Sequence, residues 1–146
     1  MGIANTTAIL LPLIGMAALT ALVQLLIPFA RIASVRRGEV TIDDFVLGES
    51  DKVPARVSIP NRNYMNLLEF PVLLYPACLI AYVATDVSGI MVAVAWTFVA
   101  LRTVHSVIHL TYNRVSHRVV AFGLSNVAMV TLWVLVTHHL VNKSAI

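Results

Sequence analysis

Ionisable side chains that interrupt long apolar stretches are the residues of this sequence best suited to chemistry. Glu69 interrupts one such stretch, and Arg102, His105 and His109 interrupt another. An ionisable group inside a membrane span costs about 2.5–3.5 kcal/mol on insertion scales, so it usually faces a bundle interior, a water-filled cavity or a partner. These four residues are therefore candidate site residues.

The spacing of the polar residues forms two stripes if both segments are helical. At about 100° per residue, Arg62, Asn66 and Glu69 project within about 60° of one another. The second stripe is about 80° wide by the same geometry and comprises Arg102, His105, His109 and Tyr112. Two polar stripes on apolar helices predict a polar site between them.

Arg118 stands at the expected start of the last apolar helix. The free amide groups and the dipole of a helix N-terminus favour an anion, and the guanidinium adds a full positive charge. We therefore expect an anion pocket where this helix start meets the two stripes. A purely structural interpretation stays open for one pair, because Glu69 and Arg102 are also able to neutralise each other between helices.

The composition is that of a membrane protein. Of the 146 residues, 59% are hydrophobic and 12% are charged, whereas a soluble domain has about 25% charged residues. The mean hydropathy is +0.86. The net charge of +3 comes from basic residues that flank apolar segments, so we expect no nucleic-acid partner.

The apolar runs predict an all-α fold, an antiparallel four-helix bundle that forms one domain over residues 1–146. A helix needs about 20 apolar residues to cross the hydrocarbon core, and the short turn at 86–89 forces a hairpin. Pro71 and Pro76 are expected to kink the second span. The expected spans are 9–30, 64–85, 90–112 and 119–140.

The polar stretch 31–62 is expected to be a loop, with an interfacial segment around 45–47. Eight basic residues lie in or beside the first and third connections, whereas the opposite side has only Lys143. The positive-inside rule then places this loop in the cytoplasm and both termini outside it. The expected helix breakers in the loop are Gly38, Gly48, Pro54 and Pro60.

These motifs resemble the MAPEG family, membrane-associated proteins in eicosanoid and glutathione metabolism, in its bacterial form. The resemblance runs from the first span to the last, and its most specific element is Arg-x3-Asn-x2-Glu, present as Arg62, Asn66 and Glu69. It implies a homotrimer in a bacterial inner membrane, with glutathione bound at the subunit interfaces. The similarity extends to Arg102, His105 and Arg118.

The family resemblance also implies individual roles. Arg118 would lie nearest the glutathione sulfur as the catalytic residue, and Arg31 or Arg37 would approach from the adjacent subunit. The resemblance implies a transferase that joins glutathione, its co-substrate, to lipophilic electrophiles arriving from the bilayer; a peroxidase activity stays open. The residues implied to hold the rest of glutathione are Arg62, Asn66, Glu69, Arg102 and His105.

Two positions depart from the family pattern. His109 stands where some members have tyrosine, with Tyr112 as the candidate replacement, so both join the expected binding residues. Val119 stands where some members have a hydroxyl residue. These departures keep a second function open, a non-catalytic protein of the same fold that binds a lipid or an amphipathic anion.

Metal chemistry is disfavoured by the placement of the histidines. Axial ligation of haem needs histidines that face each other from different helices at one depth. His105 and His109 share one helix, whereas His138 and His139 lie toward the opposite membrane side. A zinc site at His105 and His109 lacks a third ligand, so we expect no metal.

Overall fold

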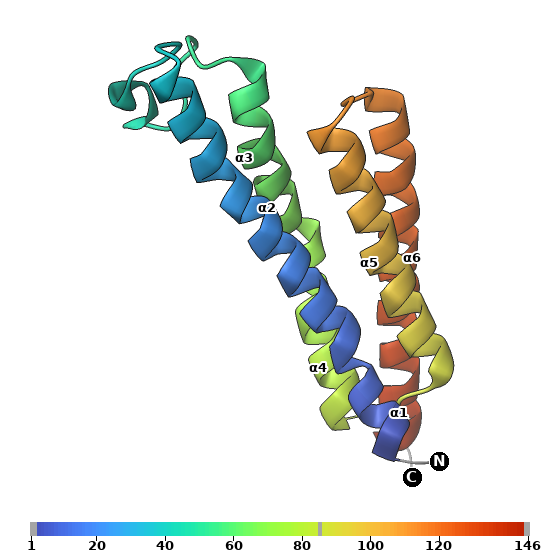
Figure 1. Cartoon of the computed structure of the whole chain (residues 1–146). Helices are drawn as coiled ribbons and strands as arrows, with labels where there is room; N and C mark the ends of the chain where they lie inside the picture. Colours follow the sequence, from blue (N-terminus) through green and yellow to red (C-terminus); the bar gives the residue numbers. More distant parts are fainter. Residues whose placement is uncertain (1–2, 85, 145–146) are drawn as a thin grey trace.

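Two helical hairpins packed against each other make up the computed structural model, which describes residues 3–84 and 86–144. The described residues are helical or irregular and contain no strand, so the predicted all-α fold is confirmed. Figure 1 shows the hairpins spreading apart at one end and both termini lying at the other. The first and third connections therefore share one end of the bundle, as predicted.

In the first hairpin, a long helix preceded by one short helix pairs with a helix in two pieces. The second hairpin pairs two unbroken helices. In the first hairpin, α1 (Ile3–Ala8) leads into α2 (Leu10–Arg36), and the returning chain forms α3 (Ala55–Leu68) and α4 (Leu74–Ala84). The second hairpin consists of α5 (Gly89–Leu110) and α6 (Val115–Ser144).

Within the described residues, four helical stretches are long and apolar enough to cross a membrane. Their outward surfaces carry large apolar side chains such as Phe29, Val83 and Val127, which are between 64% and 78% exposed. A water-facing surface of this kind is unfavourable, whereas lipid tails solvate it well. The stretches are Thr6–Arg36, Ala55–Ala84, Gly89–Leu110 and Val115–Lys143.

The buried core lies mainly in the half of the bundle near the termini. Met16 of α2, Leu74 of α4, Met91 and Phe98 of α5 and Met129 of α6 are all fully buried in one apolar cluster. Toward the other end the buried residues become polar, with Asn63, Arg102 and Ser106 among them. The packing therefore holds the hairpins together at one end and leaves polar side chains between them at the other.

The helices extend further than the expected spans. α2 continues to Arg36 and α3 already begins at Ala55, so both reach into the stretch 31–62 that was expected to be a loop. Pro60 lies inside α3 rather than in the loop. Main-chain hydrogen bonding continues past the apolar stretch, so the polar residues mark the membrane surface and not the helix end. The expected end of the second span, Thr85, lies outside the described residues.

The second membrane-spanning stretch is broken at Glu69. α3 ends at Leu68, and a 3-10 helix, η2 (Phe70–Leu73), links it to α4. Pro71 lies within η2; proline has no amide hydrogen to donate, and it disfavours the helical conformation of the residue before it. The predicted kink therefore falls at Pro71, whereas Pro76 lies in the first turn of α4, where a missing donor is tolerated.

Candidate functional site

A polar cavity of about 390 Å³ lies between α3 and the α5–α6 connection, at the end where the hairpins spread apart. Three helices and one turn contribute to its walls. Five of the residues expected from the sequence line it together, namely Arg62, Asn66, Glu69, His109 and Arg118. Two amides that sequence reasoning did not select, Asn61 and Asn113, also line it.

The stripe on α3 supplies one wall of this cavity. α3 is regular from Ala55 to Leu68, so its spacing carries Arg62 and Asn66 to the same face. The Asn66 amide nitrogen donates to the main-chain carbonyl of Arg62 across 2.8 Å, which leaves its side-chain oxygen available to a ligand. Glu69, at the helix break, supplies the one carboxylate of the cavity.

Arg118 lies in the first turn of α6, which begins at Val115, earlier than expected. Its Nη1 donates to the side-chain oxygen of Asn113 across 2.8 Å. Asn113 has a φ of 49°, a left-handed conformation that asparagine adopts more readily than most residues. The turn thus places an amide oxygen that fixes the Arg118 guanidinium at the cavity wall.

His105 and His109 form a pair behind this wall. Their ring centroids lie 6.0 Å apart in an edge-on arrangement, and both side chains are buried. His105 Nδ1 lies 3.2 Å from the main-chain oxygen of Arg118. Because a carbonyl only accepts, Nδ1 carries the hydrogen, and Nε2 of the neutral ring is left as an acceptor. His109 lines the cavity, and its Nδ1 has no hydrogen-bond partner among the described residues.

Arg102 lies deeper than the cavity and does not line it. The residue is fully buried, and its guanidinium carbon lies 5.5 Å from the Phe98 ring and 4.9 Å from the Phe122 ring. Its Nη2 donates to Asn126 across 3.4 Å, whereas Nε and Nη1 have no partner in the described chain. The ion pairs of the described residues do not include one between Arg102 and Glu69.

Two further polar residues, Tyr112 and Asn63, lie where the two stripes did not predict them. Tyr112 is 57% exposed and its hydroxyl contacts His117 Nδ1 at 3.0 Å, so it lies outside the cavity. Asn63, which was not selected, is fully buried and its Oδ1 accepts from Ser106 Oγ across 3.3 Å. Asn63 lies about 100° from Arg62 on α3 and so belongs to the buried face.

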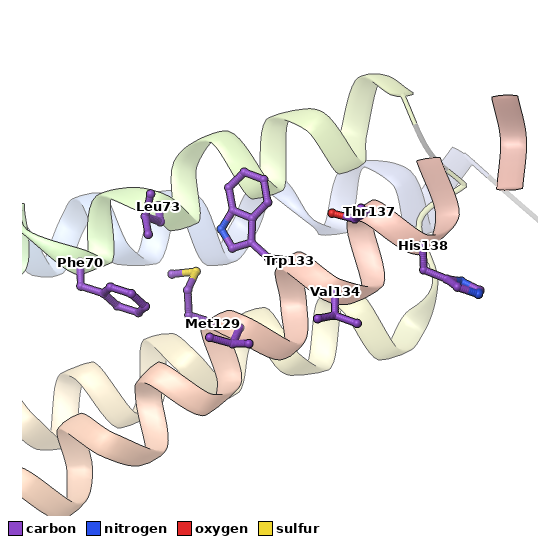
Figure 2. Close-up of a pocket in the computed structure, with 8 residues that line it drawn as sticks. Phe70, Leu73, Met129, Trp133, Val134, Thr137 and His138 are labelled. Atoms are coloured by element: carbon purple, nitrogen blue, oxygen red, sulfur yellow. The ribbon is translucent and has the colours of Figure 1, made fainter. Parts of the chain in front are cut away.

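A second, apolar pocket of about 530 Å³ lies further along the bundle, between the η2–α4 segment and α6. Figure 2 shows Phe70 and Leu73 on one side and Met129 and Trp133 on the other. The Trp133 Nε1 donor is buried and has no partner among the described residues. Glu69 lines the polar cavity and the next residue, Phe70, lines the apolar pocket, so the helix break contributes to the wall of each.

Arg31 and Arg37 do not line the polar cavity of this chain. Arg31 pairs with Glu49 across 3.3 Å and stacks 4.9 Å from the Phe45 ring. Arg37 pairs with Glu39 across 3.0 Å. Both side chains are therefore engaged in holding the loop to the end of α2.

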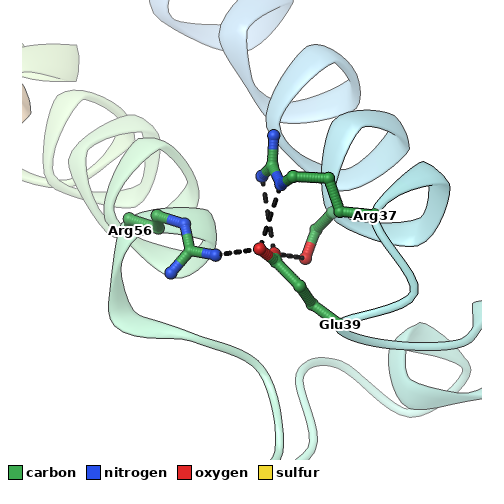
Figure 3. A network of polar contacts seen from close by, with 4 residues as sticks. Arg37, Glu39 and Arg56 are labelled. Carbon is green, nitrogen blue, oxygen red and sulfur yellow. Dashed lines mark hydrogen bonds and ion pairs between the residues drawn. The ribbon is translucent and has the colours of Figure 1, made fainter.

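Glu39 is the centre of that loop attachment. Figure 3 shows its carboxylate accepting from Arg37 of the α2 end and Arg56 of α3, and Ser34 Oγ donates to it across 2.8 Å. The hydrogen bonds from Arg37 and Ser34 lower the pKa of Glu39 from its ordinary 4.5 to about 2. The loop is thus joined to both helices of the first hairpin by one ionised side chain.

The cavity chemistry matches a small ligand with more negative than positive charge. Two guanidinium groups and one carboxylate line it, with three amides and one imidazole between them. Guanidinium groups bind carboxylates through paired hydrogen bonds. Among the described residues, no group of three or more His, Cys, Asp and Glu side chains is arranged to hold a metal ion.

Comparison with known proteins agrees with the motifs. The model of the MAPEG family matches residues 9–138, nearly the whole chain. No curated protein and no solved structure matched the chain. Four membrane-length helices and this match make it an integral membrane protein of the kind that acts in glutathione or eicosanoid metabolism. The chain belongs to the MAPEG family.

Proposed function

We propose that this protein is a membrane-embedded transferase that joins glutathione to lipophilic electrophiles. The observation that carries the proposal is the shared cavity: Arg62, Asn66 and Glu69 from α3 meet His109 from α5 and Arg118 from α6 in a space of about 390 Å³. Pockets for small ligands usually start at about 300 Å³. Membership of a family associated with glutathione supports the same ligand.

The charges of the cavity match those of glutathione. Glutathione has two carboxylates and one ammonium group, and Arg62 and Arg118 supply positive charge while Glu69 supplies one carboxylate. We assign the ammonium group to Glu69 and one carboxylate to Arg62. Asn61 and Asn66 are placed to bind the peptide groups between them.

Arg118 is the proposed stabiliser of the glutathione thiolate. A free thiol has a pKa of about 8.5, and a guanidinium beside a helix N-terminus lowers it. Arginine stays protonated, so it acts electrostatically and not as a base. The thiol proton passes to His109, the imidazole that lines the cavity. The sulfur then bonds to the electrophilic carbon, whose leaving group departs as an anion with the bonding pair.

The apolar pocket is the proposed entrance for the lipophilic co-substrate. The two residues of the Glu69–Phe70 bond each line one of the cavities, and α6 lines the apolar pocket mainly with apolar groups. An electrophile that dissolves in lipid reaches such a pocket from the side of the bundle. Arg102, buried behind the histidine pair, adds positive potential without touching the ligand.

We further propose that the protein works as a homotrimer in the inner membrane of a bacterium. In that assembly Arg31 or Arg37 reaches the cavity of a neighbouring subunit, which requires it to exchange its glutamate partner for the ligand. The basic residues at the loop end support a cytoplasmic position for that end and for the cavity, with both termini on the other side.

The direct test measures glutathione binding and conjugation by the purified protein. Calorimetry is expected to show saturable glutathione binding, and chlorodinitrobenzene is expected to give the conjugate with release of chloride. Arg118→Ala should bind glutathione yet lose most of the conjugation rate. Protein that neither binds glutathione nor forms the conjugate would contradict the proposal.

One observation favours a second function. The apolar pocket contains a buried indole donor, Trp133 Nε1, without a partner in the described chain, and an oxygen-bearing lipid supplies an acceptor. His109 and Val119, which depart from the family pattern, also suit a non-catalytic binder of lipids or amphipathic anions. Native mass spectrometry separates the two functions, because a lipid retained by protein that does not bind glutathione would favour the binder.

A further inference from the structure

An apolar groove lies on the outer side of the first hairpin, away from both cavities of the site. It has a volume of about 420 Å³ and lies between the last turns of α2 and the 3-10 helix η1 (Ile42–Phe45). Ile32 and Val35 form one wall, and Ile42 and Phe45 form the other. Two arginines, Arg31 and Arg36, complete its lining.

Apolar side chains beside this groove are as exposed as those on the membrane-facing helix surfaces. Ile42 is 75% exposed, Val46 69% and Leu47 101%, all within one short segment. Side chains this apolar gain free energy when they leave water for the boundary between headgroups and acyl chains. The same segment was expected from the sequence to lie at the membrane interface.

The position of the groove along the molecule agrees with that location. Ile32 and Val35 belong to the last turns of the membrane-length stretch Thr6–Arg36. These turns therefore lie where the apolar part of the helix meets the polar loop. A groove at this level faces lipid headgroups and the first carbons of their chains.

The charge of Arg36 takes no part in the ion pairs of the described residues. Arg31, Arg37 and Arg56 each pair with a glutamate of the loop, whereas the described residues provide no ion pair for Arg36. A phosphate at the membrane surface is the natural partner for a guanidinium that lines the groove.

Two acids of the loop already have partners. Glu49 pairs with Arg31, and Asp44 is engaged within the loop. The Asp44 carboxylate accepts from the Thr41 amide, the Thr41 hydroxyl and the Ser50 hydroxyl, across 2.8, 2.9 and 2.7 Å. Asp44 is thus directed toward the loop's own donors.

We propose that this groove binds an anionic phospholipid and that the η1 segment lies in the membrane surface. The phosphate binds Arg36. The first part of one acyl chain lies between Ile32, Val35 and Phe45. The side chains of Ile42, Val46 and Leu47 enter the membrane surface beside this chain. The proposal does not depend on glutathione chemistry, because none of these residues lines the polar cavity.

The first test measures lipid retention. Protein extracted from vesicles of phosphatidylglycerol and phosphatidylcholine is analysed by native mass spectrometry. Arg36→Gln is expected to lower phosphatidylglycerol retention about fivefold, the scale for one basic residue at an anionic surface. Lys52→Gln, which removes a positive charge elsewhere in the loop, is the matched control. Equal loss in both variants, or no preference for phosphatidylglycerol, would overturn the lipid site.

The second test measures where the segment lies. An environment-sensitive dye is attached to Leu47→Cys and, as a control, to Asp51→Cys, both in a Cys78→Ala background. The dye at 47 is expected to be quenched by headgroup-level spin-labelled lipid, and the dye at 51 by aqueous iodide. Equal iodide quenching at both positions would contradict insertion. Cross-linking between two chains through position 47 would show that a second copy covers the groove instead.

Discussion

The Nδ1–H of His105 donates to the main-chain carbonyl of Arg118 across 3.2 Å. This hydrogen bond joins the interior of α5 to the first turn of α6, the turn that carries the guanidinium of the cavity. It also fixes the tautomer of a buried ring. The position of the proposed thiolate stabiliser is thus set by a histidine behind it and by Asn113 beside it.

Replacing Arg118 with alanine is expected to lower kcat/KM for chlorodinitrobenzene about 100-fold, as does removal of one group that stabilises developing charge in other enzymes. The thiolate absorbance of bound glutathione should fall in parallel. Arg114→Ala is the matched control, because Arg114 is exposed in the same turn and does not line the cavity. Equal losses in both variants would show that the turn, rather than the Arg118 charge, matters.

Replacing Glu69 with glutamine is expected to weaken glutathione binding about tenfold, the scale for a hydrogen bond to a charged group. An analogue of glutathione without the amino group should bind both proteins equally, since it has no ammonium for Glu69. Calorimetry with both ligands makes the comparison. A variant that loses affinity for both would argue that Glu69 has a structural role.

Replacing His109 with phenylalanine is expected to lower the conjugation rate at neutral pH about 100-fold, within the usual range for loss of a general base. The deficit should shrink as the pH rises, because hydroxide then removes the thiol proton. His117→Phe, at an exposed position outside the cavity, is the control. A loss of conjugation rate that stays constant with pH would instead indicate that His109 has only a packing role.

Replacing Arg102 with methionine is expected to leave the thermal unfolding temperature unchanged or to raise it, because no carboxylate of the described chain lies within ion-pair distance of this buried charge. Conjugation should nevertheless slow. Leu132→Ala, which opens a cavity at a fully buried position, gives the reference for a purely structural loss of about 2–5 kcal/mol. A loss of stability in Arg102→Met similar to that of Leu132→Ala would show that Arg102 stabilises the fold.

Acid is expected to loosen the loop through Glu39. Its pKa is lowered to about 2 in the folded protein, so its contribution to stability is fully present above the ordinary pKa of about 4.5 and disappears as the pH falls toward 2. Glu39→Gln should therefore unfold at a lower temperature than the wild type at pH 7, by a small margin because the group is exposed. The difference should vanish at low pH. Asp43→Asn, at an exposed position in η1, should show no such convergence.

The helical spacing of the sequence was sufficient to predict the α3 wall of the site. Arg62 and Asn66 share a cavity wall because α3 is regular through both positions. The second stripe was less informative because residues 102 and 112 are about 15 Å apart along a helix, further than one small cavity extends. His109 therefore lines the cavity, whereas Arg102 lies deeper and Tyr112 lies outside.

The uncharged residues of the site were harder to predict. Asn113 lies in the turn between α5 and α6, and only its left-handed backbone and its contact with Arg118 distinguish it from other loop residues. The end of α2 at Arg36 and the start of α3 at Ala55 were also not predicted. Composition indicates where the membrane ends, whereas the main-chain hydrogen bonds of both helices continue beyond that point. The approach of Arg31 or Arg37 to a neighbouring subunit is a proposal that rests on the family resemblance, because within one chain both side chains pair with glutamates of the loop.

The helix break at Glu69 has a consequence for how two unlike molecules encounter each other. Glu69 faces a space suited to a solute from water, and Phe70 faces a space suited to a solute from oil. One peptide bond joins the residues that line these two spaces. In the proposed reaction, partners that hardly dissolve in the same phase thus reach cavities lined by neighbouring residues of one helix break.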